Sequence, residues 1–194
     1  MPPLSVATAI AVRAHSGQKR ADGRDYIEHP MAVARILMSA STHLPTSIYA
    51  AAMLHDVMED ADYSYAEIAA RVGRSAATMV LGLTRPERIQ RECRTAREER
   101  YIAQMRIVLP FEPGMLLIKI ADRIHNLQTA SALPVPRRSA LIAMTEDLYL
   151  PFFETARKAL PMELRSACAI LLEQLLSTLV HAKNPLPRMR DERM

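Results

Sequence analysis

The sequence of 194 residues has no tryptophan, three phenylalanines and only five glycines. Such a composition is poor material for a β-sheet, which relies on aromatic and β-branched residues. Alanine, leucine, isoleucine, methionine and arginine are frequent instead, and this mixture favours helices. The length fits one domain whose core is large enough to need no disulfide bonds.

Cysteine is also scarce. Cys93 and Cys168 lie far apart and follow no metal-ligand spacing, which argues against a disulfide framework and suits a reducing compartment. The N-terminal apolar stretch has no basic segment before it, so we expect no secretory signal. Every long apolar run is interrupted well short of a membrane span. We therefore expect a cytoplasmic protein that does not enter the membrane.

The chain has 25 Lys and Arg against 21 Asp and Glu, a formal net charge of +4. A basic surface attracts phosphate-rich partners without choosing between a nucleotide and a nucleic acid. Arginines recur at every third position over residues 85–100, but each step of three turns an α-helix by about 300°, so this row winds around the helix. We therefore do not expect nucleic-acid binding. The row comprises Arg85, Arg88, Arg91, Arg94, Arg97 and Arg100.

Glycine and proline divide the apolar-periodic sequence into a succession of predicted helices. This pattern predicts an all-α bundle of about eight to ten helices over residues 1–183, with a fraying tail over 184–194. Helices are expected over 4–15, from Pro30, from Pro45, over 115–131 and over 161–181. Two further helices are expected to begin at capping boxes, one at Ser64 and Glu67 that ends at Gly73, and one at Thr95 and Glu98. Another helix is expected after Pro136, with a kink or restart at Pro151.

The strongest chemical signal is the segment LHDVMED at residues 54–60. Glu59 and Asp60 follow Asp56 at i+3 and i+4, and Glu59 is at i+4 from His55, so on one helix the four groups share a side. Three carboxylates gathered there repel one another unless a cation is present. The apolar residues that precede them indicate burial rather than a charged surface.

Two further segments carry polar groups at positions that suit a site. Asp122 is adjacent to the apolar stripe of a predicted helix, and Asn126 and Thr129 follow it at i+4 and i+7. Such a polar row needs either a ligand or hydrogen bonds to neighbouring helices. His29 stands just before a helix that Pro30 would begin, although a lone histidine is more often structural than a ligand.

Together these segments supply two imidazoles and two carboxylates, a first shell for an octahedral divalent cation with open positions. The mixed ligand set suits Mn²⁺ or Fe²⁺ better than a closed structural zinc site. The cation would lower the pKa of a bound water and neutralise a phosphate oxygen, and Glu59 and Asp60 could position or deprotonate that water. The predicted ligands are His29, His55, Asp56 and Asp122.

Four ordered segments, at 15–23, 26–30, 55–60 and 119–129, resemble the RelA/SpoT-type alarmone hydrolases of the HD phosphohydrolase superfamily. The resemblance extends over about residues 7–129. It implies a compact HD-domain fold and Mn²⁺-dependent hydrolysis of the 3′-pyrophosphate of (p)ppGpp, which yields pyrophosphate with GDP or GTP. The synthetase and regulatory domains of the long members are absent, so the resemblance indicates a stand-alone small alarmone hydrolase.

The resemblance also implies a role for each matching position. His29, His55, Asp56 and Asp122 would bind Mn²⁺ or another divalent metal, and Glu59 and Asp60 would be the catalytic pair. Arg20 would stack on the nucleobase, Asn126 and Thr129 would hold the nucleoside, and Lys19 would also bind the substrate.

Three positions depart from the family pattern near the expected nucleoside pocket: Asp22, Asp25 and Gln128. They leave an adenine alarmone, (p)ppApp, open beside the guanine form, and the number of 5′-phosphates and the oligomeric state are open too. A broader HD nucleotide phosphohydrolase is the alternative enzyme, which the Tyr26 to Pro30 segment disfavours. A binding module without turnover is disfavoured by Glu59 and Asp60, whereas an antitoxin that clears a toxic alarmone is compatible with both.

Overall fold

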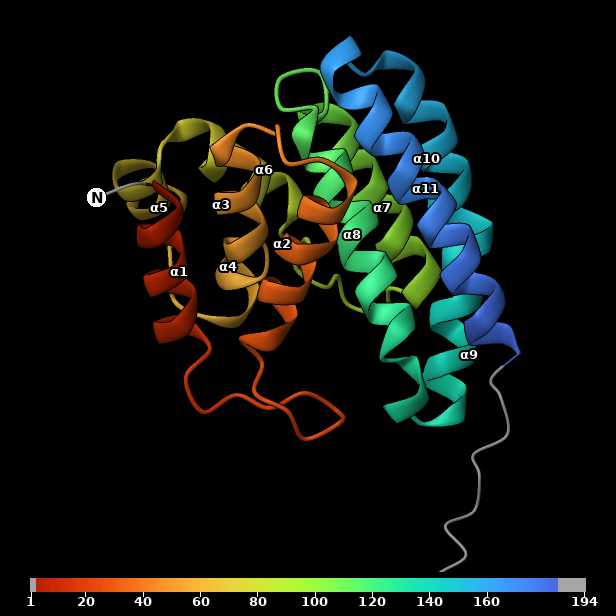
Figure 1. Cartoon of the computed structure of the whole chain (residues 1–194). Helices are drawn as coiled ribbons and strands as arrows, with labels where there is room; N and C mark the ends of the chain where they lie inside the picture. The colour runs from red at the N-terminus through yellow and green to blue at the C-terminus, as the bar shows by residue number, and fades with distance from the viewer. Residues whose placement is uncertain (1–2, 185–194) are drawn as a thin grey trace, which may run out of the picture.

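The computed structural model describes residues 3–184, and within them the predicted all-α fold is confirmed (Figure 1). Extended pairing in this part of the chain is limited to an isolated bridge between Lys19 and Asp25. The α-helices are α1 (Pro3–Ala14), α2 (Glu28–Ala40), α3 (Thr46–Leu54), α4 (Val57–Asp60), α5 (Tyr65–Val72), α6 (Arg74–Leu83), α7 (Arg94–Val108), α8 (Gly114–Gln128), α9 (Val135–Met144), α10 (Leu150–Ala156) and α11 (Met162–Lys183).

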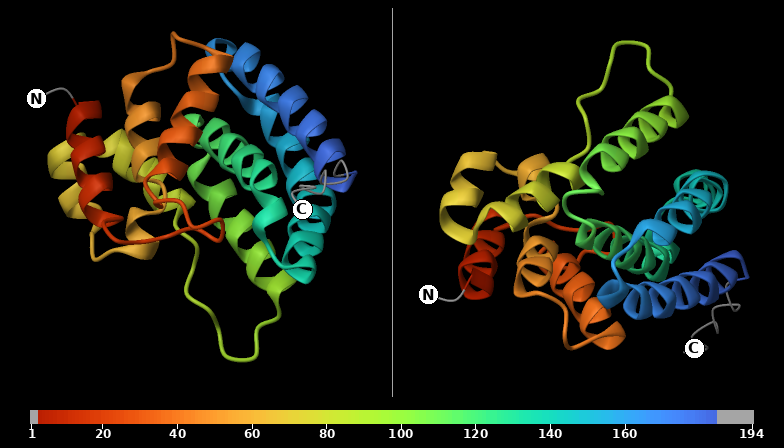
Figure 2. Two further views of the ribbon diagram at one scale, coloured as in Figure 1. Left: turned by 60° about the horizontal axis from the view of Figure 1, so that its bottom comes forward. Right: turned by 90° about the horizontal axis from the view of Figure 1, so that it is seen from above.

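Helices α2 and α8 lie side by side in the middle of the molecule. Helices α1 and α3–α6 are on one side of this pair, and α7 and α9–α11 are on the other (Figures 1 and 2). Residues 114–125 of α8 are all buried, so this helix is covered on every face. Among the described residues, no helix has both the length and the apolar character that crossing a membrane would require.

Burial of residues 114–125 of α8 is unexpected for their sequence, because four of them carry ionisable or charged side chains. Buried charges are stable only when they are paired or bind an ion. The polar residues of α8 must therefore find partners within the helix or on neighbouring helices, and the candidate site lies where several of these partners meet. These residues are Lys119, Asp122, Arg123 and His125.

Several predicted boundaries are confirmed. The capping box of Ser64 and Glu67 opens α5, and Gly73 ends it. The expected restart near Pro151 is present as a π-helical turn (Thr145–Tyr149) that leads into α10. The predicted tail lies outside the described residues except for Asn184.

Other boundaries differ from the prediction. Helix α7 has no capping box at Thr95: it begins at Arg94, and the sulfur of Cys93 accepts a hydrogen bond from the backbone of Ala96. Helix α6 had not been predicted. The helix predicted over 115–131 ends at Gln128 and is followed by a 3₁₀ turn (Ala130–Ala132).

The segment between α6 and α7 projects from the body of the molecule (Figure 2). Two arginines of the row at every third position bond this segment to α7. The Arg97 guanidinium donates to the Pro86 carbonyl, and Arg100 donates to Glu92 at 2.9 Å. Arg85, on the segment itself, pairs with the buried Glu98 of α7. Half of this basic row is therefore engaged in internal contacts.

Candidate functional site

His55 and Asp56 occupy a break between two helices. Helix α3 ends at Leu54 and α4 begins at Val57, which corrects the expectation of one continuous helix through residues 55–60. Neighbouring residues on a regular helix point about 100° apart. The break allows both side chains to face one point, with Nε2 of His55 lying 3.2 Å from Oδ2 of Asp56.

His29 and Asp122 reach the same point from two other helices. Helix α2 begins at Glu28, so His29 lies in its first turn rather than before it; Pro30 is tolerated there because the first turn needs no N–H donor. Nε2 of His29 is 3.1 Å from Nε2 of His55, 3.4 Å from Oδ2 of Asp56 and 3.3 Å from Oδ1 of Asp122. The four predicted ligands therefore converge.

These donor atoms fit a divalent cation. Two ligand atoms at right angles around an ion, each about 2.1 Å from it, are separated by ~3 Å. The separations within this cluster, from 3.1 to 3.4 Å around His29, are close to that value. His29, His55 and Asp122 are almost completely buried, whereas one fifth of the Asp56 side chain is exposed. A buried set with one solvent-facing side suits a cation that also contacts substrate.

The ligands are oriented by residues around them. The Tyr26 hydroxyl donates to Oδ2 of Asp56 at 2.8 Å, and the Lys119 ammonium donates to Oδ2 of Asp122 at 2.9 Å. The Asn126 amide donates to Oδ1 of Asp122 at 2.6 Å. Tyr26 and Lys119 had not been predicted as site residues, although the i−3 position of Lys119 relative to Asp122 on an apolar helix is a usable signal.

The electrostatics of the cluster favour positive charge. Burial opposes ionisation of both Asp56 and Asp122. The imidazoles of His55 and His29 outweigh this effect at Asp56, and Lys119 together with the imidazoles outweighs it at Asp122. Both carboxyl pKa values are therefore held well below the ordinary range. Burial alone would lower the pKa of His55, yet Asp56 and Asp122 outweigh it and raise that pKa to about 9. Without a cation, the site therefore holds a proton.

The predicted catalytic pair lies beside this cluster, on α4. Desolvation by the surrounding protein and the charge of Asp56 raise the pKa values of both Glu59 and Asp60. Glu59 accepts a hydrogen bond from the backbone N–H of Arg85, and the Asp60 carbonyl accepts one from Gln18. Both residues remain exposed to solvent, so their carboxyl groups are accessible to water.

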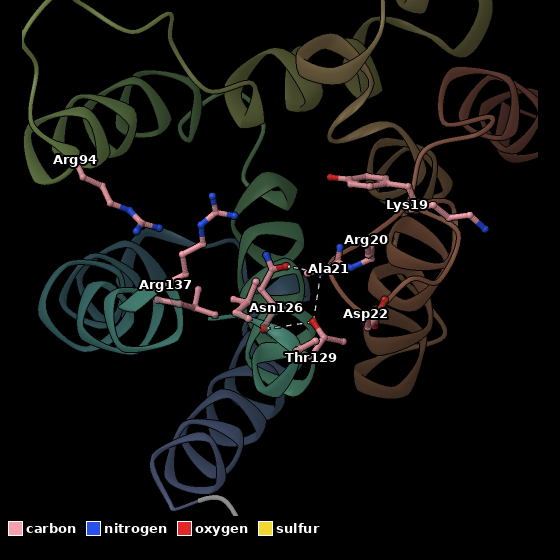
Figure 3. A pocket seen from close by; sticks show the side chains of 12 residues that line it. Lys19, Arg20, Ala21, Asp22, Arg94, Asn126, Thr129 and Arg137 are labelled. Carbon is pink, nitrogen blue, oxygen red and sulfur yellow. Dashed lines mark hydrogen bonds between the residues drawn. The ribbon is translucent and has the colours of Figure 1, made fainter. Parts of the chain in front are cut away.

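A cavity of about 390 Å³ adjoins the cluster (Figure 3). Three of the predicted substrate residues meet in it: the Arg20 guanidinium donates to Oδ1 of Asn126 at 3.1 Å and to Oγ1 of Thr129 at 3.3 Å. Lys19 also lines the cavity, but its ammonium points away and pairs with Asp25 at 2.7 Å. The bond from Asn126 to Asp122 joins this cavity to the metal ligands.

Two residues that the sequence did not single out for this site face the cavity from its opposite wall. Arg94 from α7 and Arg137 from α9 point inward across from Arg20 (Figure 3). Only the tertiary packing brings these helix starts together, and no local pattern marks them as a pair. They make this wall of the cavity basic.

Of the three departures from the family pattern, only Asp22 lines this cavity. Asp22 lines the cavity, but its carboxylate pairs with Arg24 at 2.6 Å, and that of Asp25 pairs with Lys19. Gln128 lines a separate cavity with Arg138 and not the cavity that Arg20, Asn126 and Thr129 share.

Comparison with known proteins agrees with this fold. The HD domain family matches residues 7–159, and the chain belongs to that family. The guanosine-3′,5′-bis(diphosphate) 3′-pyrophosphohydrolase of Haemophilus influenzae is 34% identical over 142 residues, which are 73% of this chain and 21% of the relative. The bifunctional (p)ppGpp synthase/hydrolase SpoT of Escherichia coli is 35% identical over 149 residues, 76% of this chain and 21% of that protein. The chain thus spans about a fifth of these relatives.

A solved structure of a metazoan ortholog of SpoT, described as hydrolysing ppGpp and playing a role in starvation responses, has the same fold. Its TM-score is 0.67 at 20% identity, and the match covers 90% of this chain and 96% of that one. The four predicted ligands and the predicted acidic pair therefore lie within a fold that this chain shares with that structure.

Binding of a divalent cation should release a proton. With its pKa raised to about 9, His55 is protonated near neutral pH without a cation and must become neutral to bind one. Apparent affinity should increase with pH and level off above about pH 9. Titration calorimetry with Mn²⁺ in two buffers of different ionisation enthalpy counts the protons. His55→Ala should abolish binding, and tight binding without proton release would contradict this account.

Proposed function

We propose that this chain hydrolyses the 3′-pyrophosphate of a nucleotide alarmone, (p)ppGpp or its adenine counterpart, with Mn²⁺ bound at His29, His55, Asp56 and Asp122. One observation carries the proposal: Asn126 contacts both Arg20 in the cavity and the metal ligand Asp122. A nucleoside in the cavity would therefore have its 3′-substituent beside the cation. The names of the sequence relatives support the same substrate.

Glu59 and Asp60 would carry out the proton transfers of this reaction. Hydrolysis breaks the bond between the 3′-oxygen and its phosphorus, so the attacking water loses a proton and the 3′-oxygen gains one. When bound, the cation supplies charge neutralisation at the phosphate and a lower pKa for water. Glu59, with its raised pKa, is suited to accept the proton of the water, and Asp60 lies one residue away to assist.

The cavity offers distinct surfaces to the two ends of the substrate. Arg20 has a planar guanidinium held in place by Asn126 and Thr129, which suits stacking on a purine. Arg94 and Arg137 on the opposite wall suit the 5′-phosphates, because arginine binds phosphate oxygens through two parallel hydrogen bonds. Since the carboxylates of Asp22 and Asp25 are already paired, neither excludes adenine or guanine.

Product analysis tests this function directly. Purified protein is incubated with Mn²⁺ and a panel of guanine and adenine alarmones, and products are identified by anion-exchange chromatography and mass spectrometry. We expect pyrophosphate together with the 5′-di- or triphosphate of at least one base. Release of inorganic phosphate from ordinary nucleotides instead would favour the broader phosphohydrolase, and an inert protein would contradict the proposal.

Substitution of Glu59 separates catalysis from metal binding. Glu59→Gln should leave Mn²⁺ affinity largely intact while kcat falls by roughly 10²-fold or more, because the amide cannot accept the proton. Glu173→Gln, an exposed change on α11, is the matched control and should behave like the unmodified chain. Undiminished turnover in Glu59→Gln would transfer the role of base to Asp60.

Substitution of Arg20 tests the stacking role. Stacking reads the face that all purines share, so Arg20→Ala should raise KM for every accepted alarmone by a similar factor, roughly 5- to 30-fold. Arg137→Met is the contrasting variant, whose effect should grow with the number of 5′-phosphates. Steady-state kinetics on both purine series provides the measurement. An effect of Arg20→Ala confined to one base would show that Arg20 reads the base edge instead.

A further inference from the structure

A buried histidine outside the ligand set contacts the metal cluster from behind. Nδ1 of His125 lies 2.7 Å from Nδ1 of His29, and their rings are stacked at 30° with centroids 4.9 Å apart. The two residues are 6% and 2% exposed, so water does not compete freely for either nitrogen. His125 belongs to α8, which also carries Asp122 and Asn126.

The arrangement of the two rings decides where their protons lie. Two imidazole nitrogens at hydrogen-bond distance share one proton, so one donates and the other accepts. Nε2 of His29 faces the other three ligands, and it can bind a cation only through its lone pair. The proton of a neutral His29 must then be on Nδ1, which donates to an unprotonated Nδ1 of His125.

The imidazole of His55 is oriented in the same way, but by a backbone carbonyl as the acceptor. Nδ1 of His55 is 2.7 Å from the carbonyl oxygen of Ala52, to which it can only donate. Its Nε2 is thereby also left free for the cation. The acceptor beside His55 thus belongs to the backbone of α3, whereas the acceptor beside His29 is the side chain of His125, which can be substituted.

We propose that His125 is a positioning residue that sets the tautomer and ring orientation of His29 by accepting its Nδ1 proton. This inference rests on the proposed function only in so far as the cluster binds a divalent cation. Acceptors behind a metal-bound histidine typically change metal affinity by about 10- to 100-fold when removed. His125 should therefore act on metal binding, ahead of any effect on turnover.

Two substitutions of similar size separate the acceptor from the space that the ring fills. His125→Leu fills much of the space without an acceptor, and His125→Asn places an amide oxygen near the position of Nδ1. In the full chain, Mn²⁺ affinity measured by electron paramagnetic resonance should fall by about 10- to 100-fold in His125→Leu and recover most of that loss in His125→Asn. His43→Leu, at an exposed histidine, is the control and should leave affinity unchanged.

The outcomes distinguish the inference from the proposed function. If the unmodified chain binds no Mn²⁺, the proposed function fails. If it binds Mn²⁺ and His125→Leu binds equally well, or His125→Asn is as weak as His125→Leu, the acceptor role of His125 is overturned.

A second measurement covers the case in which His125→Leu does not fold. In unmodified protein labelled with ¹⁵N-histidine and loaded with diamagnetic Zn²⁺, nitrogen chemical shifts should place the proton of His29 on Nδ1 and that of His125 on Nε2. A proton on Nδ1 of His125 would overturn the inference without any substitution.

Discussion

The buried carboxylate of Asp122, the partly exposed carboxylate of Asp56 and two buried imidazoles converge between the central helices, and the packing of those helices must satisfy this concentration of ionisable groups. Asp122 lies within a helix that is covered on every face, where an ionised group is costly unless it is paired. Lys119, Asn126 and the two imidazoles supply partners, and a divalent cation would supply a further one. Helix α2 and the junction of α3 with α4 must therefore pack where they bring His29, His55 and Asp56 to that carboxylate.

Asp122 also links the two halves of the proposed activity. Its Oδ1 faces the imidazoles and accepts a hydrogen bond from Asn126, which in turn accepts one from Arg20 at the cavity. Tyr26 makes a parallel connection, because its hydroxyl donates to Asp56 while the Arg20 guanidinium lies 5.7 Å from the centre of its ring. A substrate held by Arg20 would thus be positioned by the same residues that orient the predicted metal ligands.

The convergence of the four predicted ligands was predictable because imidazoles and carboxylates on apolar segments need partners once they are buried. The all-α class and the Ser64 cap followed from composition and from a local pattern. Features that depend on tertiary packing were not predictable from one sequence. The break at His55 and Asp56 is one such feature, and the basic wall of Arg94 and Arg137, which exists only when α7 and α9 meet, is another. Gln128 precedes Thr129 at the end of α8 and lines a different cavity, as expected for neighbouring residues that point about 100° apart.

The central claim is that these four side chains bind one divalent cation. Anomalous diffraction at the manganese absorption edge, from crystals of the full chain grown with Mn²⁺, tests it most directly. The account predicts one strong peak within bonding distance of Nε2 of His29 and His55 and of the carboxylates of Asp56 and Asp122. A peak bound by other residues, or fully occupied crystals in which one of these four side chains points away from the metal, would contradict it.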